Sequence, residues 1–312
     1  MYLIHSILSS ISNITAQHSE AANAVAEQAA HPTPTGGAIF THLYHHVLAH
    51  PLEIGGKPVE LTIGEYKLPV FNLQIAQIFS VILILIFFRY AYAGMKSHHP
   101  NALQRTLSGF VLWIRDEMVV PVLGDHLAHK LLPYFLSVFF FIATSNLLGL
   151  LPNPFYPFVA GAGLLPFGVT STACIFVTAG LAICTFLMMI VGGMVMNGPI
   201  KFWTGLVPHG IPAALWPLMF IVEIIGLCVK PFALTIRLFA NMTGGHLVVL
   251  SFMGLIFYFG ETLHNMAYGV AIPAVGFAVF IMIIEAFVAL LQAYIFTLLS
   301  LLFVGASLHP EH

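Results

Sequence analysis

This sequence contains very few charged residues. Of its 312 residues only 7% are Asp, Glu, Lys or Arg, whereas 59% are hydrophobic. Soluble globular domains carry roughly 25% charged residues, so a chain this poor in charge lacks the surface of a soluble domain. The formal net charge is −2 with neutral histidines. This leaves no basic surface for nucleic acid, and we expect no nucleic-acid partner.

Cysteine and N-terminal basic residues are also scarce. The three cysteines, Cys174, Cys184 and Cys228, lie in apolar segments without metal-ligand spacing, which indicates neither a disulfide framework nor a cysteine metal site. No Lys or Arg precedes Lys57. A secretory signal begins with positive charge and a mitochondrial transit peptide is rich in arginine, so we expect neither. An organellar chain of this kind would be organelle-encoded or already processed.

The N-terminal part contains a histidine cluster, His42, His45 and His46, in the sequence HLYHH. Its spacing would suit a metal site on a helix, but no carboxylate or cysteine accompanies it. We therefore predict no metal and no cofactor.

Long apolar runs fill the C-terminal three quarters of the chain. Runs of about twenty residues can cross a bilayer as helices, and these are too continuous for the alternating strands of an outer-membrane barrel. The sequence predicts an all-α integral membrane protein with five to six helices. We expect residues 1–70 to form an extra-membrane region whose fold the sequence does not define, and residues 71–308 a single membrane domain.

The first three membrane spans are predicted at Leu73–Gly94, Leu131–Leu151 and Phe167–Met196. The segment Thr106–Gly124 carries charges between apolar residues, which favours a position along the membrane surface.

Two further apolar stretches, Ala213–Phe259 and Tyr268–Val304, are much longer than the roughly twenty residues that one perpendicular helix needs. Gly244-Gly245 is the only candidate turn in the first, and none follows Pro273 in the second. We therefore predict two long, strongly tilted helices that lie against each other, rather than two hairpins.

The basic residues predict the orientation. Lys96, Arg105, Arg115 and Lys130 all lie between the first and second spans, which marks that loop as cytoplasmic or matrix-facing. With five crossings, the N-terminal region is expected outside and the C-terminus inside.

The most informative residues are polar side chains inside the two long stretches. A charged group at the bilayer centre costs at least ~2.5–3.5 kcal/mol, so each needs a partner, water or a function. They are Glu223, Lys230, Arg237, Asn241, His246, Glu285 and Gln292.

Helical geometry sorts these residues into faces. Glu223, Lys230 and Arg237 recur every seventh residue and share one face, which Asn241 extends by one turn. His246 follows Arg237 by nine residues, which places it about half a turn off that face and roughly 13 Å along the axis. Glu285 and Gln292 are again seven residues apart on the second long helix.

The chemistry of these groups suggests a division of roles. Arginine stays protonated at physiological pH, whereas histidine titrates near pH 6.5. His246 and Glu285 could therefore pass protons while Arg237 blocks a through path. Other interpretations stay open: Arg237 or Lys230 could extend toward the interface, Arg237 could pair with Glu223, and His246 could be a structural histidine. Glu285, inside IMIIEAFVALL, has no structural explanation.

The segment VEIIGLCVKPFALTIRLFANMTGGHLVV, residues 222–249, resembles the most diagnostic region of subunit a of the rotary F-type ATP synthases. In that family a Glu precedes an essential arginine by fourteen residues, a basic residue and Pro lie between, and R-L-F-x-N-M follows; this chain matches each position. SNLLGLLP, with Asn146, resembles the second-span signature, and EAFVALLQAYIFTLL, with Gln292, resembles the last helix. The resemblance runs from about residue 70 to the C-terminus.

The resemblance implies a non-catalytic, proton-translocating stator subunit. It implies that the two long helices face a c-subunit ring and that Arg237 meets the ring's carboxylate. His246, Glu285, Asn146 and Gln292 would belong to an outer half-channel and Glu223 to an inner one, while Asn241 extends the Arg237 face. Partners would be the c ring, peripheral-stalk b subunits, the other F1Fo subunits, protons and the lipid bilayer. A bacterial inner membrane is favoured, with a mitochondrial inner membrane as the alternative.

Two positions differ from many relatives. Many bacterial members have Glu at the position of His246 and His at that of Glu285, so the pair is kept in exchanged order. Some relatives have an Asp where this chain has Gly149, so an outer path cannot depend on that acid here.

Two other functional classes remain as alternatives. A secondary transporter would show internal repeats and broken helices at matching positions, and the sequence has neither. A structural membrane subunit of a respiratory complex would have no need for Arg237.

Overall fold

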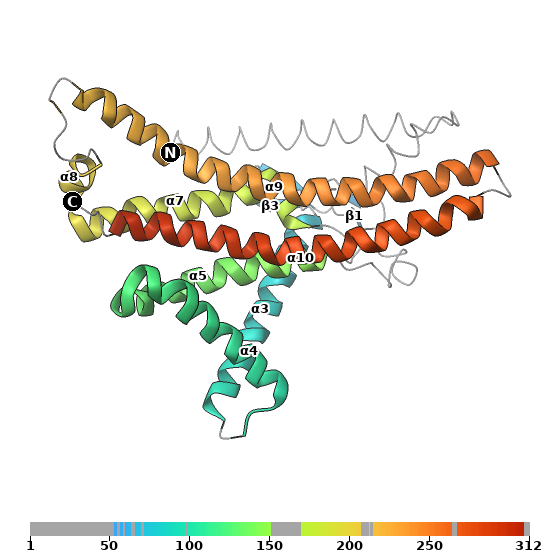
Figure 1. Ribbon diagram of the computed structural model, residues 1–312, viewed down its shortest axis with the longest axis horizontal. Coiled ribbons are helices and arrows are strands. Elements are labelled where there is room, and N and C mark those ends of the chain that lie inside the picture. Colours follow the sequence, from blue (N-terminus) through green and yellow to red (C-terminus); the bar gives the residue numbers. More distant parts are fainter. Residues whose placement is uncertain are drawn as a thin grey trace. The chain divides into compact units, whose positions relative to one another are not determined.

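The computed structural model describes most of the apolar part of the chain and little of the N-terminal region. Within the described residues the chain is helical apart from two short antiparallel hairpins (Figure 1). The histidine cluster and the Pro-rich segment after the second predicted span lie outside them. The described residues are 53–54, 57–58, 60–63, 66–69, 72–97, 99–150, 170–206, 212, 215–263 and 267–308.

The two hairpins precede the first long helix. Strand β1 (Glu53–Ile54) pairs with β2 (Lys57–Pro58), and β3 (Glu60–Ile63) pairs with β4 (Tyr66–Pro69). The predicted extra-membrane region therefore includes β structure.

Nine helical segments follow. Five stretches among the described residues are long and apolar enough to cross a membrane, which confirms the predicted all-α membrane architecture. The segments are α3 (Asn72–Lys96), α4 (Ala102–Trp113), a π-helical turn η1 (Ile114–Val119), α5 (Val120–Leu150), a 3-10 turn η2 (Ser171–Ala173), α7 (Ile175–Asn197), α8 (Pro199–Thr204), α9 (Trp216–Leu263) and α10 (Ala267–Leu308), counted over the described ranges.

The two long apolar stretches form single helices, as predicted. Helix α9 has 48 residues and α10 has 42, and each contains a proline, Pro231 and Pro273. Thr235 Oγ1 donates a hydrogen bond to the Pro231 carbonyl at 2.9 Å. The Gly244-Gly245 pair is helical rather than a turn, although each glycine costs about 1 kcal/mol relative to alanine in a helix. The strong tilt in a membrane stays a prediction.

Two predicted boundaries need correction. Helix α5 starts well before Leu131, and Pro133 lies inside it without ending it. The helical backbone breaks at Gly124, with φ 70° and ψ 163°. That break coincides with the end of the predicted surface segment; its position at a membrane surface stays a prediction. Helix α7 begins at Ile175 rather than near Phe167. The hydroxyl residues before it compete for backbone hydrogen bonds, and Cys174 is extended.

The chain forms two compact units, each assembled from three segments. The first unit contains Met1–Phe79, Ser145–Ser171 and Met242–Phe287. The second unit contains Ser80–Thr144, Thr172–Asn241 and Val288–His312. The prediction that residues 71–308 form one membrane domain stays a prediction.

Within each unit α9 and α10 lie against each other. In the first unit the Phe252 and Phe277 rings stack with centroids 5.8 Å apart, and His246 lies opposite Glu285. These two pairs run in opposite chain order, so the helices are antiparallel there. In the second unit Lys230 of α9 lies over the Phe303 ring of α10.

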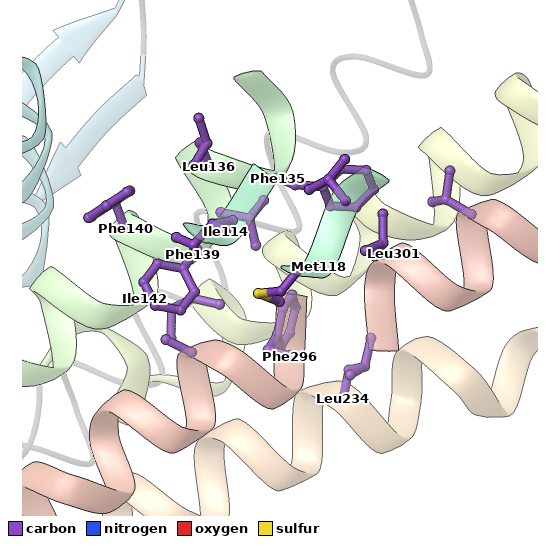
Figure 2. Packing of buried hydrophobic residues seen from close by; sticks show 14 of the residues in the cluster. Ile114, Met118, Phe135, Leu136, Phe139, Phe140, Ile142, Leu234, Phe296 and Leu301 are labelled. Carbon is purple, nitrogen blue, oxygen red and sulfur yellow. The ribbon is translucent and has the colours of Figure 1, made fainter. Parts of the chain in front are cut away.

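The hydrophobic core lies in the second unit. The π-helical turn buries Ile114, Met118 and Val119, because its wider spiral keeps these residues on one side. Figure 2 shows Met118 beside Phe296 of α10, with Leu234 of α9 also in the cluster. The consecutive segments η1 and α5 are thus packed together with α9 and α10, which are distant from them in sequence.

Polar contacts connect the helices of the second unit at two places. Thr185 of α7 hydrogen-bonds the Tyr134 hydroxyl at 3.0 Å and the Ser300 hydroxyl at 3.4 Å. Near the end of α10, Ser307 Oγ donates to the Met189 carbonyl at 2.6 Å, and Asn197 Nδ2 donates to the Ser307 carbonyl at 3.0 Å.

Candidate functional site

Arg237 lies near the middle of α9 and is exposed. No carboxylate in the described part of the chain lies within ion-pair distance of its guanidinium. Glu223 lies fourteen residues earlier in the unbroken helix, about 21 Å along its axis, and so cannot pair with Arg237. The alternative of an internal Glu223–Arg237 ion pair is therefore excluded.

The surface around Arg237 is lined by small residues. Ala233 and Ala240, one turn to either side, are exposed, and Asn241 is exposed one turn after Arg237. Small neighbours leave the guanidinium uncovered, so a partner from outside the chain can approach it closely.

Two other charged residues of this helix, Lys230 and Glu223, have different surroundings. Lys230 is half-buried, with Nζ 5.2 Å from the centroid of the Phe303 ring. A cation over an aromatic face is stabilised by the ring quadrupole, so Lys230 has a partner within the second unit. Glu223 is half-buried, seven residues before Lys230.

His246 and Glu285 lie together in the first unit. The distance from His246 Nδ1 to Glu285 Oε1 is 4.0 Å, and the side chains are only 13% and 6% exposed. Neither carboxylate oxygen of Glu285 has a hydrogen-bond partner among the described residues. A buried carboxylate without such bonds is costly. The arrangement therefore suits a group that exchanges protons with the adjacent imidazole.

Gly245 makes this close approach possible. A Cβ atom at position 245 would overlap the carboxylate of Glu285, whereas a Cβ at Gly244 would meet nothing within 4 Å. The two glycines of the candidate turn thus have different roles, and only Gly245 makes room for Glu285.

Thr170 also contacts His246, although no sequence pattern points to it. Its Oγ1 lies 2.5 Å from His246 Nε2, and the residue is 3% exposed. Its partner is 76 residues away in the chain. No periodic pattern includes Thr170, because it precedes α7 in a non-helical segment, so the sequence carried no signal for this contact.

Asn146 and Gln292 are both buried, at 0% and 5% exposure. Asn146 precedes Gly149 by three residues on α5 and therefore lies on the same side of that helix, in the first unit with His246 and Glu285. Gln292 belongs to the second unit, as do Arg237, Asn241 and Glu223, and its Nε2 has no hydrogen-bond partner among the described residues.

These features define a multi-pass helical membrane protein with a buried His–Glu pair and an exposed mid-helix arginine. Residues 75–305 match the family described as ATP synthase A chain. The match covers well over half of the sequence, and the chain belongs to this family.

Curated bacterial relatives agree with the family match. The chain is 39% identical over 244 residues to an ATP synthase subunit a of Anaeromyxobacter sp. strain Fw109-5, covering 76% of this chain and 54% of that protein. It is 35% identical over 265 residues to the subunit a of Chloroherpeton thalassium, covering 84% and 71%. It is 34% identical over 318 residues to ATP synthase subunit a 2 of Chlorobaculum tepidum, covering 99% and 83%. The chain spans about half the length of the Anaeromyxobacter relatives.

Proposed function

We propose that this chain is the proton-translocating stator subunit of a rotary F-type ATP synthase, in which Arg237 couples proton flow to rotation of a c-subunit ring. The observation that carries the proposal is an exposed arginine at mid-helix with no anionic partner among the described residues. A permanent cation in that position needs an anion from outside the chain. A carboxylate on a passing c subunit meets this need.

The guanidinium favours the ionised form of such a carboxylate, so a proton leaves the ring as the carboxylate passes. The same charge separates two offset half-channels and prevents a direct proton path between them. We assign His246, Glu285, Asn146 and Gln292 to the outer half-channel, Glu223 to the inner one, and Asn241 to the surface that faces the ring.

The chain itself is proposed to be non-catalytic, with ATP chemistry in other subunits of the complex. Its partners are the c ring, the peripheral-stalk b subunits and the surrounding lipid. The bacterial origin of the relatives supports a bacterial plasma membrane as its location.

The test is ATP-driven proton pumping by the complete complex in membrane vesicles, with Arg237→Ala compared to Arg89→Ala. Arg89 is a second exposed membrane-helix arginine, on α3, and serves as the matched control. We expect Arg237→Ala to abolish pumping and Arg89→Ala to retain it, at equal co-purification with the c ring. Coupled pumping by Arg237→Ala would overturn the proposal in favour of a structural subunit or another transporter.

A further inference from the structure

We propose that Thr170 is a positioning residue of the outer half-channel, whose hydroxyl holds the His246 ring with Nδ1 toward Glu285 and fixes the proton on that nitrogen. This inference rests on the proposed function, because it assigns a role in the path through His246 and Glu285. All three residues belong to the first unit.

The contacts of His246 involve both ring nitrogens. Nε2 lies 2.5 Å from Thr170 Oγ1, while Nδ1 lies 4.0 Å from Glu285 Oε1. The hydrogen bond at Nε2 holds the ring with Nδ1 toward Glu285, because a half-turn about χ2 would put ring carbons in the places of both nitrogens.

The hydroxyl of Thr170 also selects the tautomer. When the threonine O–H donates to Nε2, the neutral ring carries its proton on Nδ1, where it points to the carboxylate. The other tautomer would turn the Nδ1 lone pair toward an ionised Glu285, and two acceptors facing each other repel. When a proton from water reaches Nε2 through the Thr170 hydroxyl, which takes up another proton from water in its place, the ring can release its Nδ1 proton to Glu285 without becoming an anion.

Gly149 gives the Thr170 hydroxyl its space. A Cβ atom at position 149 would overlap Thr170 Oγ1 and crowd its Cβ. Gly149 is buried on α5, directly against this hydroxyl. Thr170, His246 and Glu285 form a row of three polar side chains. Gly149 packs against Thr170 at one end of this row, and Gly245 packs against Glu285 at the other.

Further polar atoms of the first unit are buried without protein partners among the described residues. They are Ser171 Oγ, which follows Thr170, and Thr243 Oγ1, which lies one turn before His246 on the same side of α9. Buried hydroxyls of this kind are usually satisfied by water. Their presence beside the row fits a hydrated path that reaches Thr170 and His246.

The experiment measures ATP-driven proton pumping by the complete complex in vesicles, normalised to the amount of this chain. Thr170→Val replaces the hydroxyl by a methyl group, and we expect the rate to fall about tenfold through loss of one hydrogen bond. Thr170→Ser keeps the hydroxyl and should restore most of the rate. A purely structural role would respond to side-chain volume rather than to the hydroxyl.

A second pair of variants moves the hydroxyl from position 170 to helix α5. Because a Cβ at position 149 would lie at the Thr170 hydroxyl, Gly149→Ser combined with Thr170→Gly can supply a hydroxyl there, whereas Gly149→Ala combined with Thr170→Gly cannot. We expect only the serine version to pump well. If the Thr170→Val protein does not accumulate in the membrane, these two double variants provide the test of the Thr170 hydroxyl.

The assignment would be overturned by any of three results. These are wild-type pumping by Thr170→Val, a rate that Thr170→Ser does not restore, and equal rates in the two double variants. Arg237→Ala is measured in parallel. Normal pumping by Arg237→Ala would contradict the proposed function itself, whatever the rates of the Thr170 variants.

Discussion

His246 Nδ1 on α9 and Glu285 Oε1 on α10 face each other at 4.0 Å, with both side chains largely buried. This distance exceeds a direct N–H···O hydrogen bond, which spans about 2.7–3.2 Å. A proton can cross it through one bridging water or after a small side-chain movement. The pair is therefore close enough to exchange protons without forming a fixed ion pair.

Glu285→Gln should slow proton flux about 100-fold, because the amide cannot take up and release a proton while its size is nearly unchanged. The measurement is ATP-driven acidification of vesicles that contain the complete complex. Glu117→Gln, at an exposed position in the π-helical turn, is the control and should pump normally. Near-normal flux in Glu285→Gln would remove this residue from the path.

Gly245→Ala should impair pumping, because the added methyl group would overlap the Glu285 carboxylate and displace it from His246. Gly244→Ala adds the same methyl group one residue earlier, where a Cβ meets nothing within 4 Å, and should pump at the wild-type rate. Both variants gain the same helix propensity, so their difference isolates the contact with Glu285. Equal rates for the two variants would contradict the geometry described for Gly245.

Gly193→Ala should destabilise the second unit by about 1–3 kcal/mol, as overpacking of a well-packed interior does. A Cβ at position 193 would overlap Ser307 Oγ and the Phe202 ring, and it would disturb the hydrogen bond from Ser307 to the Met189 carbonyl. Gly180→Ala on the same helix meets no atom within 4 Å and should be neutral or stabilising. The midpoint of thermal unfolding in detergent distinguishes them, and a similar midpoint for both would refute the prediction.

Thr185→Val should lower the free energy of unfolding by about 0.6–1.7 kcal/mol, the range measured for side-chain hydrogen bonds in membrane helices. The hydroxyl contacts both Tyr134 and Ser300. A double-mutant cycle with Tyr134→Phe isolates the Tyr134 contact, because the two changes should be less than additive. Additive effects would mean that the Tyr134–Thr185 hydrogen bond contributes nothing to stability.

The long helices could be predicted because their apolar stretches contain no usable turn. Proline at positions 231 and 273 did not end either helix, and Gly244-Gly245 stayed helical. The boundaries of the second and third spans were predicted less well. A local glycine conformation sets one of them, at Gly124, and backbone competition by hydroxyl residues sets the other, before Ile175.

The candidate site was predictable only as far as helical spacing extends. A spacing of seven residues identified the Arg237 face and placed Glu285 and Gln292 on one side of α10. Both of these side chains are buried in the structure. The contact of His246 with Thr170, and the space that Gly149 and Gly245 leave, depend on segments that meet only in the folded chain. A linear pattern cannot contain that information.

The overlap between positions 149 and 170 has an evolutionary consequence. In any relative with this packing, a side chain can appear at position 149 only if the residue at position 170 becomes smaller or turns away. The two positions should therefore change together across lineages, and a polar group should pass between them rather than be duplicated. Family sequences would then show whether α5 or the segment before α7 supplies the oxygen beside the histidine.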